Sequence, residues 1–172
     1  MSTVNTKKVS DRRSLRFGRM SDLIDDVSAF EGNIQASGNW TPAQIVEHVT
    51  KLIQCSLDGF EVPNAPLIVR GIVKMMRSSV LNKPMKPGVK LPGNFKFLVP
   101  SDDVTWAQAT GHLKKVVDRI EKGERMKQRS PVLGFLEHEE WIQLHCRHSE
   151  MHFSFLQPVE KTPEASTESN SE

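Results

Sequence analysis

The segment Trp141–Leu156, WIQLHCRHSEMHFSFL, constrains the fold of this chain more than any other segment. Apolar residues recur in it at helical spacing, which predicts one amphipathic helix. Histidines lie in the same apolar stripe, although this face of a helix is normally the driest. The stripe therefore predicts a helix that buries imidazoles against its neighbours. Its apolar members are Trp141, Leu144, Met151 and Phe155, and its histidines are His145, His148 and His152.

His148 and His152 are spaced i, i+4, so their Cβ atoms should lie about 5–6 Å apart on one helix face. Two imidazoles at this separation can bind one metal ion. The alternative is a pair of core histidines that are hydrogen-bonded to backbone or side chains, and the pair alone does not decide between the two. The segment HSEMH is not the zincin motif, because Ser149 stands where that motif requires glutamate.

Length and composition favour one domain in a cytoplasmic protein. The chain has 172 residues and a formal net charge of +2, which is too small to imply a nucleic-acid partner. Its two cysteines, Cys55 and Cys146, have neither metal-type nor redox-type spacing and are interpreted as reduced, buried thiols. No apolar run approaches the ~18–20 residues needed to span a bilayer, and the polar N-terminus has no apolar core of a secretory signal.

The chain divides into a polar arm over residues 1–13, a single domain over residues 14–157 and an acidic tail over residues 158–172. The arm and the tail are expected to be disordered because both are predominantly polar. Capping boxes at Thr41/Gln44 and Thr105/Gln108 mark two sharp helix starts. With little strand signal, the pattern predicts an all-α, antiparallel four-helix bundle. Its helices are expected near residues 21–30, 42–60, 105–122 and 141–156, the last of them ending at Pro158.

Residues 61–100 form an insert of a different kind. The insert contains six prolines and seven Lys or Arg residues but only one acid, Glu61. Within it, Leu67–Leu81 can form a short amphipathic helix that covers one end of the bundle. Arg70, Lys74 and Arg77 share one side of that helix, and we expect them to form a basic strip near the mouth of the site. An ordinary solvated face is the alternative for this strip.

The predicted second helix supplies another inward histidine, His48, on the face that also carries Ile45 and Leu52. Facing helices of a bundle bring such residues together in the core, where bundles build metal sites. His48, His148 and His152 could thus give three neutral nitrogens to one divalent ion and leave an open position for water or substrate. His145 is expected to lie beside the site without ligating, and His112 and His138 are expected to face solvent.

These residues resemble the DinB/YfiT-like superfamily of metal-dependent helical proteins. The resemblance covers about Leu15 to Gln157 and rests on a histidine in a Trp-Thr-Pro-led helix (WTPAQIVEHV) and on the H-x-x-x-H pair before an aromatic residue (HSEMHFSF). A branch of unassigned function also shares the start Leu15-Arg16-Phe17, a proline-rich insert and the segment from Gly134 to Trp141. Met151 departs from many members, which have a further histidine there.

The resemblance implies an up-down-down-up bundle with a zinc- or nickel-type ion held by His48, His148 and His152. Some relatives are thiol-dependent transferases or isomerases that use low-molecular-weight thiols such as bacillithiol or mycothiol. The leading hypothesis is therefore a metal-dependent, transferase-like or hydrolase-like enzyme in which the ion activates water or a thiol for attack on a small molecule. The alternative is a non-catalytic helical bundle that binds a metal or ligand.

The expected partner is a small-molecule substrate, with no membrane partner. Whether the chain forms a homodimer is left open. Nucleic-acid binding is disfavoured, because the chain has no helix-turn-helix, no RNA-binding signature and no extended basic helix with aromatics.

Overall fold

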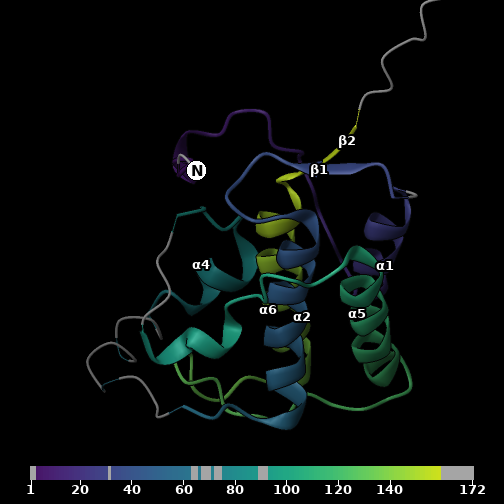
Figure 1. Ribbon diagram of the computed structural model, residues 1–172. Helices are drawn as coiled ribbons and strands as arrows, with labels where there is room; N and C mark the ends of the chain where they lie inside the picture. The colour runs from purple at the N-terminus through teal and green to yellow at the C-terminus, as the bar shows by residue number, and fades with distance from the viewer. Residues whose placement is uncertain are drawn as a thin grey trace, which may run out of the picture.

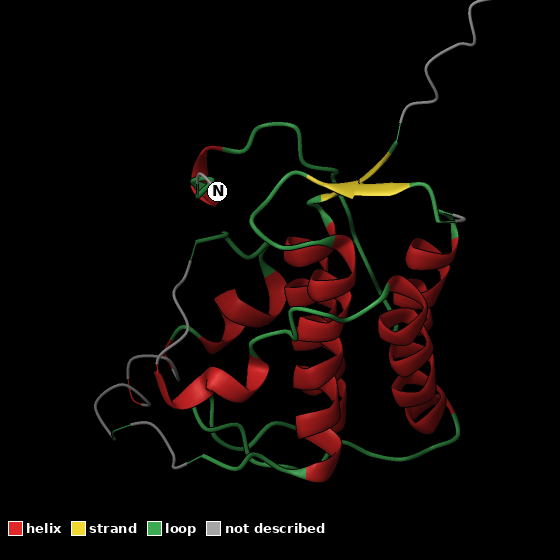
Figure 2. Ribbon diagram, viewed as in Figure 1, coloured by secondary structure: helices red, strands yellow, loops and turns green. Residues whose placement is uncertain are grey.

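A computed structural model describes residues 3–30, 32–62, 66, 71, 75–88 and 93–159 (Figures 1 and 2). The described part is mostly helical, and its helix packing is compatible with the predicted bundle. It differs from the prediction by a small sheet and by two 3-10 helices, which the sequence did not indicate. The helices are α1 (Ser21–Ser28), α2 (Pro42–Asp58), α4 (Arg77–Asn82), α5 (Trp106–Glu121) and α6 (His138–Phe153), with two 3-10 helices, η1 (Thr6–Lys8) and η2 (Gly93–Leu98).

Helix α2 is central and packs against both α5 and α6 (Figure 1). It begins with the predicted capping box, in which Thr41 accepts a hydrogen bond from the Gln44 backbone and the Gln44 side chain accepts one from the Thr41 backbone. This arrangement satisfies two backbone donors that a helix start leaves free. The same reciprocal bonds cap α5 at Thr105 and Gln108, so both predicted helix starts are confirmed.

Helix α6 lies beside α2 and begins one turn before Trp141, where the Glu140 side chain accepts a hydrogen bond from the Glu137 backbone. The prediction that it continues to Pro158 is wrong. The helix ends at Phe153, and Leu156–Pro158 form strand β2, which pairs antiparallel with β1 (Ile34–Ala36). These ladder bonds give the backbone an alternative to the last helical turn.

The sheet also sets the relative direction of the two central helices. Strand β1 lies shortly before α2 in the chain, and β2 lies shortly after α6. The start of α2 and the end of α6 are therefore at the same end of the molecule, so the two helices are antiparallel (Figure 1). This direction matters for the site, because it places His48 and His152, each within about two turns of that end, side by side.

The segment before α1 packs on the ends of other elements. Val4 exchanges two hydrogen bonds with the Asn39 side chain, of 2.7 and 2.8 Å. Arg13 forms a bidentate ion pair with Asp26, with N–O distances of 2.8 and 2.7 Å, and also donates to the Phe153 carbonyl. These contacts link Val4 to the loop before α2, and Arg13 to α1 and to the end of α6. The Phe17 and Met20 side chains are buried in the core.

Only part of the predicted insert helix can be compared with the structure. Residues 67–70 and 72–74 lie outside the described residues, so the predicted positions of Arg70 and Lys74 are not described. Helix α4 covers the end of the predicted range and packs on α6. Its Arg77 forms an ion pair with Glu140 at the start of α6, to which the Arg77 Nε donates at 2.9 Å. The positive charge of Arg77 is thus paired with Glu140, which lies about two turns of α6 before His148.

None of the helices in the described part of the chain combines the length and apolar character that a membrane crossing requires.

Candidate metal centre

The structure brings together the three predicted histidines from two helices. His48 comes from α2, and His148 and His152 come from successive turns of α6. One ring nitrogen from each lies within 4.8 Å of the other two, so these residues form a group that could hold a metal ion. The ring centroid of His48 lies 5.2 Å from that of His148 and 4.5 Å from that of His152.

A backbone carbonyl orients the His48 ring. The Nδ1 atom of His48 lies 2.8 Å from the carbonyl oxygen of Leu98, at the end of η2. A carbonyl oxygen only accepts, so Nδ1 carries the proton and donates it to Leu98. The neutral ring then has its lone pair on Nε2, which is the usual arrangement of a metal-ligating histidine with an outer hydrogen bond.

The Nδ1 atom of His148 is buried and has no hydrogen-bond partner among the described residues. Burial of an unsatisfied polar nitrogen is costly, and a ligand at such an atom would remove the cost. For three nitrogens bound tetrahedrally at about 2.1 Å from zinc, geometry gives an N–N separation of about 3.4 Å. The nitrogens of the group lie within 4.8 Å of one another, so each pair is at most about 1.4 Å further apart than in a zinc site.

The environment keeps all three imidazoles neutral at neutral pH. Burial lowers the pKa of His48, although the hydrogen bond to Leu98 opposes this shift. Burial lowers the pKa values of His148 and His152 well below the ordinary value, and repulsion from neighbouring histidines lowers them further. Metal ligation requires neutral imidazole, so these rings need not lose a proton before they bind an ion.

An indole ring covers one side of the group. Trp40 lies just before α2 and stacks on His152, with a centroid distance of 5.7 Å and an interplanar angle of 17°. Its centroid is also 4.8 Å from that of His48. His48 is 3% exposed, whereas His148 and His152 are half-buried, so the group is reached from its α6 side. Sequence reasoning missed this contact, although an aromatic residue directly before a helix cap was a visible signal.

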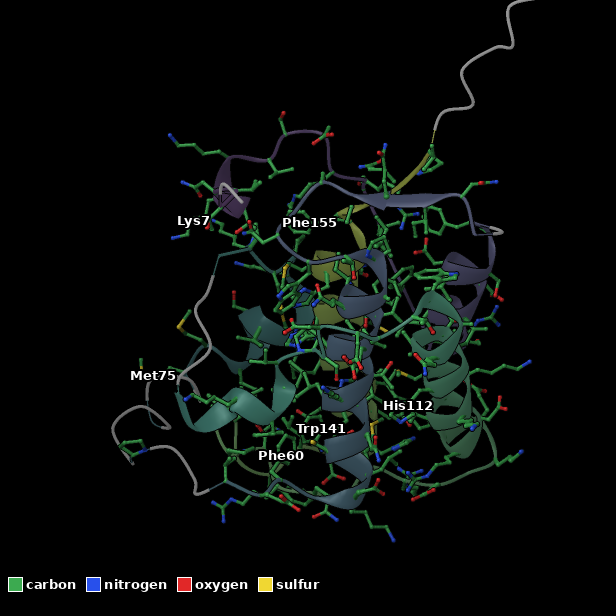
Figure 3. The ribbon with its side chains drawn as sticks, in the orientation of Figure 1. Lys7, Phe60, Met75, His112, Trp141 and Phe155 are labelled. Carbon is green, nitrogen blue, oxygen red and sulfur yellow. The ribbon has the colours of Figure 1, made fainter. Side chains whose placement is uncertain are left out.

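His145 belongs to the same stripe but not to the group. Its Nε2 lies 2.9 Å from the Ser56 hydroxyl of α2, and its ring stacks on Trp141. Trp141 in turn stacks on Phe60, so aromatic packing fills this end of the α2–α6 interface (Figure 3). The ring is fully buried, and burial lowers the pKa of His145 to about 3. His145 thus bonds to the core through Nε2, while its Nδ1 is buried without a partner among the described residues, and it lies outside the group as expected.

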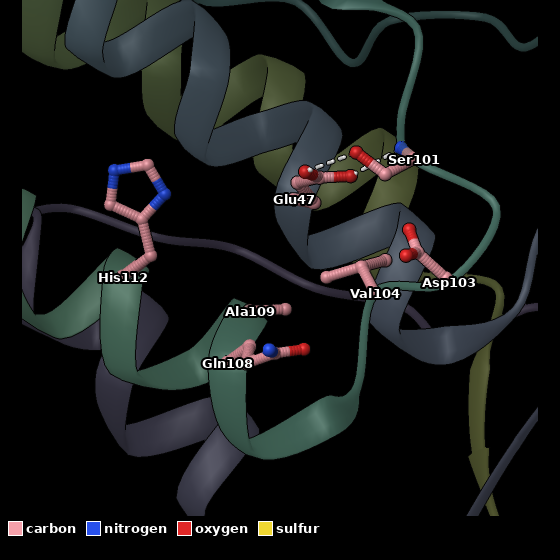
Figure 4. A pocket seen from close by; sticks show the side chains of 7 residues that line it. All are labelled: Glu47, Ser101, Asp103, Val104, Gln108, Ala109 and His112. Atoms are coloured by element: carbon pink, nitrogen blue, oxygen red, sulfur yellow. Dashed lines mark hydrogen bonds between the residues drawn. The ribbon is translucent and has the colours of Figure 1, made fainter.

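The other two histidines are less exposed than expected. His138 is half-buried and its Nδ1 accepts a hydrogen bond of 3.0 Å from the Met126 backbone. His112 is also half-buried and lines a hollow of about 290 Å³ between α2 and α5 (Figure 4). The other polar side chains in this hollow are those of Glu47, Ser101, Asp103 and Gln108, so none of the three grouped histidines lines it.

The carboxylates nearest in sequence to the grouped histidines have other partners. Glu47 accepts hydrogen bonds from the backbone and hydroxyl of Ser101 (Figure 4) and pairs with Lys51. Glu150 is buried on another face of α6, where it accepts the Phe17 backbone N–H and pairs with Arg147. Neither residue is free to act as a base at the histidines.

Both cysteines are free thiols. Burial raises the pKa of Cys55 to about 11 and that of Cys146 to about 12. Thiolate is the form that ligates metals and attacks electrophiles, so both cysteines are poor candidates for either role at neutral pH. The prediction of reduced, buried thiols is confirmed for Cys146, whereas Cys55 is reduced but only half-buried.

The family described as "protein of unknown function (DUF1569)" matches residues 9–159, and the chain therefore belongs to this family. Neither the comparison with curated proteins nor the comparison with solved structures gives a match.

Proposed function

We propose that this member of the DUF1569 family is a divalent-metal-dependent enzyme in which His48, His148 and His152 are the metal ligands. The observation that carries the proposal is the convergence of three neutral ring nitrogens within 4.8 Å, from two helices. A lone buried histidine is usually satisfied by the protein, as His145 is by Ser56. The Nδ1 atoms of His145 and His148 are both buried without a hydrogen-bond partner among the described residues, but only that of His148 belongs to a histidine of the group, where a metal ion could bind it.

The chain's own residues prepare the site for one ion and one further ligand. The Leu98 carbonyl fixes the His48 tautomer, and Trp40 shields one side of the group from water. The half-buried faces of His148 and His152 leave one side open for water or a cosubstrate. A bound zinc or nickel ion would supply Lewis-acid activation of water or a thiol at that open position.

We further propose the up-down-down-up helix order of the DinB/YfiT-like superfamily. Support comes from contacts along the helices. Arg119 near the end of α5 pairs with Asp58 at the end of α2, which favours a parallel arrangement of these two helices. The β1–β2 pairing favours the antiparallel arrangement of α2 and α6. A crossover between two parallel helices is also consistent with the long connection between α2 and α5.

The reaction class that we propose is thiol-dependent transfer to, or hydrolysis of, a small electrophile. It is supported by the lack of a free carboxylate base among the residues next to the ligands, because a metal-bound nucleophile does not need one. A low-molecular-weight thiol would serve as cosubstrate, since the chain's own thiols have raised pKa values. The alternative is a non-catalytic metal-binding bundle.

The decisive experiment is metal analysis of the protein purified without an affinity tag, followed by a thiol-consumption assay. One equivalent of zinc or nickel per chain supports the site, and metal-dependent loss of bacillithiol or mycothiol in the presence of a chloronitrobenzene supports the transferase reading. Stoichiometric metal without any turnover favours the non-catalytic bundle. Protein that takes up no divalent ion after incubation with zinc or nickel would overturn the proposal.

A further inference from the structure

Arg147 is a buried cation that its protein partners satisfy only in part. Its side chain is 4% exposed, and its Nη2 donates to the Phe17 carbonyl and pairs with Glu150 Oε1 at 2.7 Å. The Nε and Nη1 atoms are buried and have no hydrogen-bond partner within the described part of the chain. A guanidinium carries five donors, so this one leaves most of its bonding capacity unused. Such burial is costly unless another acceptor is present.

Arg147 lines a hollow on the side of α6 that faces away from the grouped histidines. On a helix, residues 143, 146 and 147 fall on a different face from residues 148 and 152. The hollow has a volume of about 250 Å³ and lies between α6, the end of α4 and the segment before α1. Its lining includes Arg16, Leu81, Asn82, Gln143 and Arg147.

The charges around this hollow favour an anion with a single negative charge. Arg16 and Arg147 are positive, and Glu150 compensates one of them from beside Arg147. One positive charge is left for a ligand, and Arg16 is exposed at the edge of the hollow, where it can meet an incoming ligand. A dianion such as phosphate would leave an excess negative charge near Glu150.

The remaining lining residues indicate which other groups the ligand carries and how large it is. The amides of Asn82 and Gln143 can donate to oxygens, and Leu81 offers an apolar surface. The volume is below that of pockets for drug-sized ligands, so the ligand must be small. We propose that this hollow binds a small monocarboxylate, with its carboxylate between Arg16 and Arg147 and its short apolar chain toward Leu81.

The test uses butyrate as the probe and butyramide as its uncharged isostere, with the full chain in EDTA so that no metal can bind the carboxylate. The readout is the NMR signal of the Arg147 Nε–H together with backbone amides of residues 143–147. Butyrate is expected to shift these signals with a dissociation constant in about the millimolar range, as suits a ligand of this size. Butyramide is expected to bind at least about tenfold more weakly, because it lacks the charge.

Arg16→Gln is the informative variant, because Arg16 is exposed and its loss should not affect folding, whereas Arg147 variants risk leaving Glu150 unpaired. Arg16→Gln should weaken butyrate binding about fivefold, the effect of one lost surface charge. Arg129→Gln, an exposed arginine outside the hollow, is the matched control and should bind butyrate as the wild type does. Equal shifts with butyrate and butyramide, an unmoved Arg147 Nε–H signal, or unchanged binding in Arg16→Gln would each overturn the proposal.

Discussion

The Nδ1 atom of His48 donates a hydrogen bond of 2.8 Å to the carbonyl oxygen of Leu98, fifty residues further along the chain. This bond joins α2 to η2 and fixes which nitrogen of His48 is free to bind a ligand. Outer hydrogen bonds of this kind typically change metal affinity by about 10–100-fold when they are lost. The pair therefore connects the conformation of residues 93–98 to the proposed metal site on α2 and α6.

The i, i+4 pair on α6 is expected to be essential for metal binding. His148→Ala and His152→Ala should each abolish stoichiometric binding of zinc or nickel, because two nitrogens make a weak, exchangeable site. Both variants should stay helical, since both side chains are only half-buried. Metal content and far-ultraviolet circular dichroism measure the two effects. His145→Ala is the control that should retain metal, because its Nε2 bonds to Ser56 instead. One tightly bound ion per chain in both α6 variants would contradict the assignment.

His48 is expected to link metal binding to the stability of the whole fold, because it joins α2 to α6 through the ion. A ligand that binds only the folded state at about 100 times its Kd stabilises that state by about 2.7 kcal/mol. For a domain of this size, this corresponds to a rise in Tm of about 5–10 °C. Thermal unfolding with and without zinc should show such a rise in the wild type and little or none in His48→Ala. An equal rise in both proteins would remove His48 from the ligand set.

Sequence patterns predicted those features that depend on local spacing. The capping boxes at Thr41 and Thr105 were visible because their residues are three apart, and the His148–His152 pair was visible because helical periodicity places them on one face. The convergence of His48 with this pair followed from bundle geometry and needed only the antiparallel packing of two amphipathic helices.

The missed features all involve segments that are distant in sequence. Strands β1 and β2 have three residues each, too few for a periodic signal, and they pair across more than one hundred residues. The burial of Arg147 and Glu150 also depends on such a contact. Helical spacing places Glu150 on a flank away from the histidines, but it does not show that Glu150 accepts a hydrogen bond from the Phe17 backbone. The stacking of Trp40 on His152 likewise depends on the path of the loop between β1 and α2, which the sequence does not show.

Trp40 should report metal binding directly, because its indole stacks on His152 and lies beside His48. Paramagnetic ions quench nearby indoles, so nickel should reduce the tryptophan fluorescence of the wild type in proportion to occupancy. Trp40→Phe should lose most of this response while it still binds about one ion, because phenylalanine can cover the same side. Trp106→Phe, which changes a half-buried residue at the start of α5, should keep the response. Full quenching in Trp40→Phe would mean that nickel binds nearer another tryptophan.

His145 should make the stability of the metal-free protein depend on pH. Burial lowers its folded pKa to about 3, whereas the unfolded value is about 6.5, so below that value the unfolded state binds more protons. Its contribution is present above pH ~6.5 and is lost progressively as the pH falls, by about 2 kcal/mol between pH 7 and pH 5. Urea unfolding in EDTA should therefore show a shallower loss of stability over this range in His145→Gln than in the wild type. The difference in pH dependence between the two proteins can be assigned to His145, because the grouped histidines are present in both. Parallel stability curves for the two proteins would show that His145 gains a proton in the folded state at moderate pH.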